Sequence, residues 1–177
     1  MIKIYVVGPY SNYTNWIENH TIVKKLEDAD LILFAGGEDV HPSLYKEPTG
    51  QFTSANIRRD LEEKKYYKEA KHLKKPVISI CRGSQFICVM NGGKLVQHQE
   101  NPSFLHNIQT YDGRTLEVTS THHQAAFPYN LPQEDYELIG WSENISRFHL
   151  DGNNEEMNPP YEAEIVYYPK SNDLGIQ

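Results

Sequence analysis

The sequence predicts an α/β protein with a mostly parallel central sheet flanked by helices, and with extra short antiparallel strands in its C-terminal half. Two observations support this prediction. In the first half, short apolar runs that end at glycine-containing turns alternate with segments of helical periodicity, which is the pattern of parallel crossover units. After Gly93, only short strand-like pieces between turns remain. The 177 residues fit a single domain over residues 1–177, since domains usually run about 100–200 residues.

The first third of the chain reads as strand, helix, strand. Residues 2–7 and 31–34 are apolar runs that end at a Gly-Pro and a Gly-Gly pair, as buried strands often do. Between them, apolar residues recur at helical spacing, so we expect a helix over residues 22–29. The residues that carry this spacing are Ile22, Val23, Leu26 and Ala29.

A charged surface helix and a second strand-helix unit follow. Residues 58–75 are dense in charge, with Asp60 and Lys64 four apart, a spacing that lets two side chains pair on a helix. Residues 76–80 then read as a strand, and residues 83–90 read as a short helix that ends at an Asn-Gly-Gly turn. The buried stripe of the first helix is expected to consist of Tyr66, Ala70 and Leu73.

The second half of the chain is expected to add short strands and no helix. Residues 151–160 are polar and rich in turn formers, so we expect an exposed loop there. The expected strands cover residues 94–97, 115–119, 137–141, 147–150 and 162–168.

Composition argues against several classes of function. With 17 Lys and Arg against 24 Asp and Glu, the formal charge is -7, which disfavours nucleic acid or an anionic membrane as the main partner. The apolar runs are far shorter than the roughly 18 residues of a membrane span, and the N-terminus lacks a signal-peptide pattern. Cys81 and Cys88 are too few for a disulfide framework and have no zinc spacing. We therefore expect a cytoplasmic protein without a metal or cofactor.

The most informative stretch places a cysteine between a strand and a helix. Cys81 follows the expected strand, and Gly83 opens the expected helix. This order is that of a nucleophile elbow, in which a sharp turn lifts the nucleophile clear of the sheet. We expect the helix N-terminus to lower the pKa of the thiol and the Arg82 N–H to face a developing oxyanion. The alternative is that Cys81 is a small buried residue at the end of a strand.

A pair of glycines follows the strand at residues 31–34. Gly36 and Gly37 would let the backbone approach a ligand closely and present N–H groups to it. Because ligands bind at the carboxyl edge of parallel strands, we expect this turn and Cys81 to face one pocket. The alternative is an ordinary tight turn.

Several motifs match the signatures of one known family in the same order. Residues 36–47 resemble the signature G-G-x-D-V-x-P-x-x-Y-x-E, and residues 76–83 resemble the nucleophile segment K-P-x-x-G-I-C-R-G. Residues 120–125 resemble N-S-x-H-H-Q-A, and residues 174–177 resemble the strand L-G-V-Q. Arg59, Asp60 and Glu63 resemble an R-D-x-x-E helix start. Together these motifs resemble the gamma-glutamyl-gamma-aminobutyrate hydrolase branch of the class I glutamine amidotransferases.

The resemblance implies a flavodoxin-like, class I glutamine amidotransferase fold and hydrolysis of a gamma-glutamyl amide, either glutamine or a gamma-glutamyl-amine. Cys81 would form a glutamyl thioester and release ammonia or an amine, and water would then release glutamate. The oxyanion would be held by the N–H groups of Arg82 and of the Gly36-Gly37 turn. The implied partners are the small gamma-glutamyl substrate and a synthetase that receives the ammonia. The residues implied to bind the substrate are Gln85, His122, His123 and Gln124.

Two departures from the family pattern bear on activity. Ser79 stands where the family usually has Gly, and the chain ends at Gln177, where the family continues into a His-Pro-Glu segment that completes a Cys-His-Glu triad. We favour the reading that the natural protein continues past Gln177 and that this single domain lacks its C-terminal end. The second reading is a catalytically impaired binding or regulatory subunit. The third is a rearranged site in which His122 or His123 acts as the base.

The histidines show no metal-ligand spacing. If the adjacent His122 and His123 lie on a strand, their side chains point to opposite faces, so only one of them can reach a shared pocket. The remaining histidines are expected at the surface or in loops. They are His20, His41, His72, His98, His106 and His149.

Overall fold

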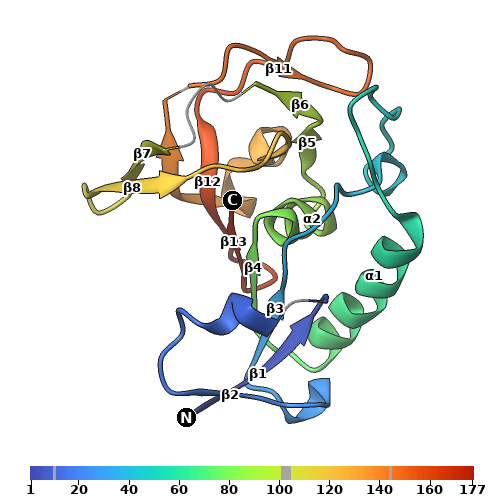
Figure 1. The fold of residues 1–177 in the computed structure, drawn as a ribbon, viewed down its shortest axis with the longest axis vertical. Helices are drawn as coiled ribbons and strands as arrows, with labels where there is room; N and C mark the ends of the chain where they lie inside the picture. The colour runs from blue at the N-terminus through green and yellow to red at the C-terminus, as the bar shows by residue number, and fades with distance from the viewer. Residues whose placement is uncertain (10, 101–104, 144) are drawn as a thin grey trace.

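The computed structural model describes residues 1–9, 11–100, 105–143 and 145–177 and shows an α/β fold (Figure 1). Its α-helices are α1 (Ile57–His72) and α2 (Arg82–Met90). Within the described ranges, neither is a long apolar helix of the kind that could cross a membrane. The strands are β1 (Ile2–Val7), β2 (His20–Ile22), β3 (Leu31–Phe34), β4 (Val77–Ile80), β5 (Lys94–Val96), β6 (His98–Gln99), β7 (Leu105–Thr110), β8 (Thr115–Thr119), β9 (Ala125–Phe127), β10 (Glu137–Ser142), β11 (His149–Leu150), β12 (Glu162–Tyr168) and β13 (Asp173–Ile176).

The main sheet has a parallel half and an antiparallel half. In the described part of the chain it has nine strands in the order β2-β1-β3-β4-β13-β12-β10-β7-β8. The strands from β2 to β13 run parallel, and each later neighbour is antiparallel. This confirms the predicted fold class, including the antiparallel strands from the C-terminal half. The short pairs β11-β6 and β5-β9 lie beside this sheet.

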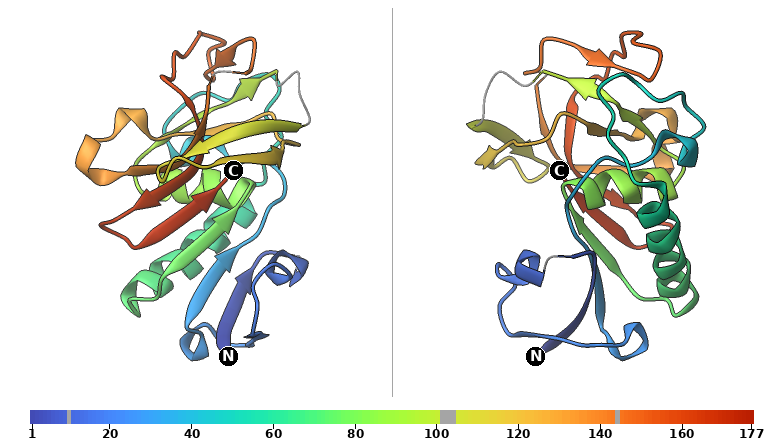
Figure 2. Two further views of the ribbon diagram at one scale, coloured as in Figure 1. Left: turned by 90° about the vertical axis from the view of Figure 1, so that its left-hand side faces the viewer. Right: turned by 45° about the vertical axis from the view of Figure 1, so that its right-hand side comes forward.

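Both α-helices pack on the same face of the parallel strands. The ring of Phe34 in β3 stacks on Phe86 of α2 with 5.4 Å between centroids, and it meets the edge of Tyr67 of α1 at 6.4 Å. Figure 2 shows the two helices on one side of these strands. A smaller apolar cluster, built around Ile4 and Leu33, covers the opposite face. The parallel strands are therefore buried on both faces near their centres, as such strands usually are.

The prediction of a helix over residues 22–29 is wrong. The chain there forms the edge strand β2, parallel to β1, and then a single 3-10 turn at Leu26–Asp28. Leu26 and Ala29 are buried, as their spacing suggests, but Ile22 is exposed. Pairing with β1 satisfies the backbone of an otherwise open sheet edge, which outweighs the weak helical pattern of a short segment.

The helix predicted over residues 58–75 is confirmed as α1, but its buried stripe differs from the prediction. The buried side chains are Asp60, Glu63, Tyr67 and Ala70, whereas Leu73 is exposed. The first turns of α1 bury carboxylates because these groups have an arginine partner on α2. Asp60 therefore does not pair with Lys64, contrary to the expected spacing pair.

Candidate active site

Cys81 lies at the junction between β4 and α2, where the chain turns sharply. Its backbone has φ 53° and ψ -116°, and its side chain is half-buried. Its N–H donates to the carbonyl oxygen of Ile176 at the end of β13, 2.7 Å away. A positive φ at a non-glycine residue costs free energy and is concentrated at functional sites. The junction has the geometry expected of a nucleophile elbow, and the role of Cys81 as nucleophile stays a prediction.

Close packing around the elbow explains which residues the turn accepts. A Cβ on Gly83 would overlap with the carbonyl oxygen of Phe34 at the end of β3, so α2 reaches the sheet only through a glycine. Ser79, which departs from the family pattern, is fully buried, and its hydroxyl donates to the carbonyl oxygen of Leu174 at 3.0 Å. The serine is therefore accommodated in the strand without an unpaired polar group.

The Gly36-Gly37 turn stands beside the elbow. Phe34 at the end of β3 pairs with Ser79 of β4, so Gly36 and Cys81 follow the carboxyl ends of two neighbouring parallel strands. A Cβ on Gly36 would overlap with the Tyr13 side chain. The turn and the cysteine therefore lie at one edge of the sheet, and their facing a single pocket stays a prediction.

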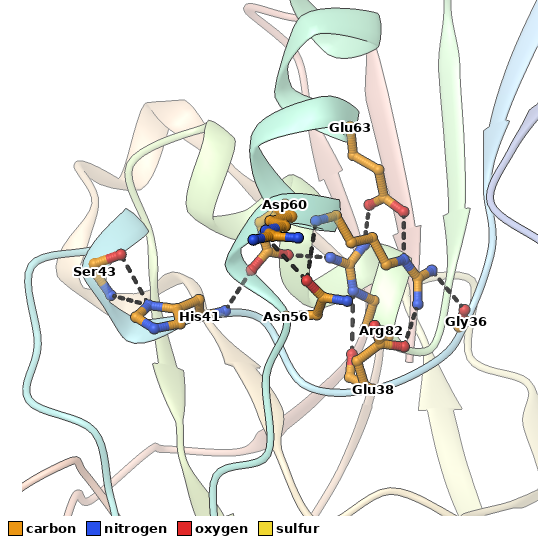
Figure 3. Close-up of polar contacts among 10 residues, drawn as sticks. Gly36, Glu38, His41, Ser43, Asn56, Asp60, Glu63 and Arg82 are labelled. Carbon is orange, nitrogen blue, oxygen red and sulfur yellow. Dashed lines mark hydrogen bonds and ion pairs between the residues drawn. The ribbon is translucent and has the colours of Figure 1, made fainter.

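A buried ion network joins the elbow, α1 and the glycine turn (Figure 3). The Arg82 side chain is 1% exposed and forms ion pairs with Asp60 and Glu63. Its Nε donates to the carbonyl oxygen of Glu38 at 3.2 Å. Arg59 completes the network through Glu63. The sequence motifs predict only a backbone role for Arg82, whereas its side chain also ties α2 to the glycine turn.

The predicted substrate-binding glutamines lie in contact. Gln85 of α2 donates from Nε2 to the carbonyl oxygen of Gln124 at 2.9 Å, and His122 contacts the same oxygen through Nδ1 at 2.9 Å. The side-chain oxygens Oε1 of Gln85 and Gln124 are buried and have no hydrogen-bond partner among the described residues. Unpaired buried acceptors are rare in folded proteins. Each of these two oxygens therefore keeps an unused acceptor site in the described part of the chain.

His122 and His123 follow β8 in an irregular segment and not in a strand, so the condition under which only one of them could reach a shared pocket does not hold. Both line one cleft of about 550 Å³. His123 Nε2 contacts the carboxylate of Asp39, 3.2 Å away. Cys81 is outside the lining of this cleft. The residues that line it are His98, Gln99, Glu100, Ser120, Thr121, His122, His123 and Phe148.

The pKa of the Cys81 thiol is raised, contrary to the expected lowering by the helix N-terminus. Burial is the main cause, the Arg82 N–H opposes it, and the Asp39 carboxylate raises the pKa further. In the described part of the chain, no histidine is among the groups that shift this pKa. Asp39 also raises the pKa of His123 through their hydrogen bond. Asp39 is thus a charged neighbour of both groups, although it is not among the site residues predicted from the sequence.

Replacing Asp39 by asparagine is expected to lower the pKa of Cys81. The carboxylate disfavours the thiolate, so removing its charge raises the thiolate fraction at neutral pH. The pH profile of Cys81 alkylation by iodoacetamide, followed by mass spectrometry, should then shift to lower pH. Asp112→Asn, in the exposed turn between β7 and β8, is the matched control and should leave the profile in place. An unchanged profile in Asp39→Asn would contradict this assignment.

Two histidines expected at the surface are buried. His106 in β7 contacts Glu164 through Nε2 at 3.0 Å, and His149 in β11 contacts Glu162 through Nε2 at 2.9 Å. The two glutamates lie two residues apart on β12 and share one face of the sheet. A buried imidazole needs such a partner, and this pairing arises only from the fold. Within the described ranges, no group of three or more His, Cys, Asp or Glu side chains is arranged to hold a metal ion.

Comparisons with known proteins agree with this fold. A glutamine amidotransferase from Thermotoga maritima superposes with a TM-score of 0.63 at 14% identity, over 99% of this chain and 74% of that chain. A protein from Thermoplasma acidophilum, described as one subunit of GMP synthase, superposes with a TM-score of 0.59 at 19% identity, over 100% of this chain and 83% of that chain. At these identities the likeness concerns the fold alone.

Sequence comparisons identify the family. NtpR of Enterococcus hirae is 31% identical over an alignment that covers 85% of this chain and 73% of NtpR. Residues 15–125 match the family model Peptidase C26. This match spans more than half of the chain and includes the glycine turn, the elbow and the His122-His123 segment. The chain therefore belongs to the peptidase C26 family of class I glutamine amidotransferase-like proteins.

Proposed function

We propose that this protein hydrolyses a gamma-glutamyl amide, either glutamine or a gamma-glutamyl-amine, through a glutamyl thioester on Cys81. The observation that carries the proposal is the φ of 53° at Cys81, between β4 and α2. Such a conformation costs about 1–3 kcal/mol and persists where the surrounding structure imposes it. The chain belongs to a family with hydrolase and amidotransferase chemistry. This membership supports a catalytic role for the residue in that conformation.

The proposed reaction has two steps. The Cys81 thiol gives up its proton and the thiolate attacks the gamma-carbonyl carbon. The C–N bond breaks, and ammonia or the amine leaves with that proton. Water then attacks the thioester carbon, the C–S bond breaks, and glutamate is released with the thiol restored. In both steps the negative charge on the carbonyl oxygen would be stabilised by the N–H groups of Arg82 and of the Gly36-Gly37 turn.

The amino-acid end of the substrate would be held by Gln85, Gln124, His122 and His123. The buried Oε1 atoms of Gln85 and Gln124 are acceptors without a partner in the described part of the chain. A substrate ammonium group offers several N–H donors, which would satisfy these oxygens. The histidines line the adjoining cleft. We therefore expect substrates with a free alpha-amino group to react faster than N-acylated ones.

A second candidate function is a binding or regulatory subunit that keeps the site without turnover. The raised pKa of the Cys81 thiol favours it, because a thiol is a weaker nucleophile than a thiolate. If the site does turn over, we propose that the ammonia passes to a synthetase partner, as the name of one protein of similar fold, a GMP synthase subunit, suggests for that protein. Cys81 and Cys88 are free thiols, which suits the reducing cytoplasm, where we place the protein.

Product release tests these candidates. The full chain would be incubated with glutamine, gamma-glutamyl-gamma-aminobutyrate and gamma-glutamyl-p-nitroanilide, and glutamate would be measured. The hydrolase proposal predicts release of glutamate from at least one of them, in proportion to enzyme. Binding of a substrate by calorimetry without any release would instead favour the regulatory subunit. If the chain neither binds a substrate nor releases glutamate, both candidates are contradicted.

A further inference from the structure

The Arg59 side chain connects α1 to the glycine turn through several hydrogen bonds. Its Nη2 donates to the carbonyl oxygen of Gly36 at 2.9 Å, and its Nη1 donates to the Glu38 carboxylate at 2.7 Å. Its Nε donates to Glu63 at 2.7 Å. With three of its groups held, the guanidinium is fixed in position against the turn.

The bond to Gly36 sets the direction of the next N–H group. In a trans peptide the C=O of one residue and the N–H of the next point in opposite directions, and the structure has no cis peptide bond in its described residues. Because Arg59 holds the Gly36 carbonyl, the Gly37 N–H points away from Arg59. This N–H has no hydrogen-bond acceptor among the described residues, so it is free to serve a ligand.

The shape of the turn depends on the same arginine. Gly37 has φ 146°, and a Cβ at this position would overlap with the Arg59 guanidinium. The guanidinium therefore occupies the space beside the Gly37 Cα, and the turn cannot relax toward α1 while Arg59 is in place. Phe34 at the end of β3 pairs with Ser79 of β4, so Gly37 and Cys81 both follow the carboxyl ends of these neighbouring parallel strands.

We propose that Arg59 is a positioning residue for the oxyanion hole: by holding the Gly36 carbonyl, it aims the Gly37 N–H at the carbonyl oxygen of the substrate. The inference rests on the proposed hydrolysis at Cys81 and adds the side chain that organises one of its donors. Arg59 itself touches neither the substrate nor the thiol. Its contribution is to keep the donor oriented before the charge develops.

The test compares Arg59→Lys with the neighbouring control Arg58→Lys, using gamma-glutamyl-p-nitroanilide. Arg58 is exposed on the preceding position of α1. Lysine keeps the charge but cannot donate to Gly36, Glu38 and Glu63 from one planar group. We expect kcat of Arg59→Lys to fall by about 10²-fold, near the lower range for losing one oxyanion donor, with KM nearly unchanged. Arg58→Lys should match the wild type.

Alkylation of Cys81 separates this role from general damage. Iodoacetamide reacts with the thiolate by displacement of iodide and needs no oxyanion hole, so Arg59→Lys should be alkylated at the wild-type rate. A lower kcat with unchanged alkylation and an unchanged melting temperature supports the proposal. An unchanged kcat, or a loss of alkylation that parallels the loss of kcat, would overturn it.

A failure of the proposed function gives a different result. If the wild-type chain releases neither p-nitroaniline from gamma-glutamyl-p-nitroanilide nor p-nitrophenol from the activated gamma-glutamyl p-nitrophenyl ester, the hydrolase proposal fails by itself. The orientation of the turn is then read from the backbone amide signal of Gly37 in ¹⁵N NMR spectra. A large shift of this signal in Arg59→Lys but not in Arg58→Lys supports the positioning role, and an unchanged signal contradicts it.

Discussion

Replacing Cys81 by serine is expected to reduce the release of glutamate by about 10⁶-fold, the scale seen when a protease loses its nucleophile. The serine hydroxyl is a far weaker nucleophile than the thiolate. Initial rates with gamma-glutamyl-p-nitroanilide measure the effect. The melting temperature should stay close to that of the wild type, because Cys81 is only half-buried.

Cys88, on the helix α2 that follows Cys81, provides the matched control. It is fully buried in the core, and burial raises the pKa of its thiol to about 11, so it is not a thiolate at neutral pH. Cys88→Ala should retain activity at temperatures where the protein is folded. Activity that survives in Cys81→Ser, or that is lost only in Cys88→Ala, would show that the nucleophile lies elsewhere.

Replacing Arg82 by methionine is expected to destabilise the protein by about 3–5 kcal/mol, the usual cost of removing one partner from a buried ion pair. Asp60 and Glu63 are 0% and 3% exposed, so neither carboxylate could recover its lost interaction from water. For a chain of this size the melting temperature should fall by roughly 6–20 °C. Thermal unfolding followed by circular dichroism measures this change.

An exposed arginine provides the comparison for Arg82. Arg147 lies 3.4 Å from Glu100, and the two side chains are 70% and 52% exposed. Such a surface pair contributes about 0–1 kcal/mol, so Arg147→Met should melt close to the wild type. Equal melting temperatures for the two variants would refute the view that the Arg82 network holds the elbow, α1 and the glycine turn together.

The elements with a strong local pattern were open to prediction from the sequence. The strand at Val77–Ile80, the cysteine after it and the helix at Arg82–Met90 form a unit whose apolar run, glycine and periodicity agree with each other. The strands β8 and β12 have the predicted bounds. In these segments the local sequence pattern favours the same conformation that the chain has in the fold.

Other features depend on partners that are distant in the sequence. β6 and β9 are very short, and β2 exists only because β1 offers an edge; no periodicity develops over so few residues. The buried carboxylates of α1 look like a solvated face until Arg82 is placed opposite them.

In the candidate site, too, some features follow from local sequence motifs and others depend on residues that are distant in the sequence. The turn geometry at Cys81 and the contact between Gln85 and Gln124 agree with the sequence motifs. The positions of Asp39, Arg59 and the paired histidines could not be predicted, because each depends on loops brought together by the sheet. Nor could the raised pKa of Cys81 be predicted, since burial and the Asp39 carboxylate outweigh the backbone N–H at the helix start.

The most direct test of the central claim is the mass of the protein during turnover. The full chain would be mixed with gamma-glutamyl p-nitrophenyl ester, whose leaving group needs no proton, and quenched in acid before the thioester hydrolyses. Intact mass spectrometry followed by peptide mapping should find one added glutamyl group, located on the peptide that contains Cys81. Release of p-nitrophenol without an adduct, or an adduct on another residue, would contradict a thioester on Cys81.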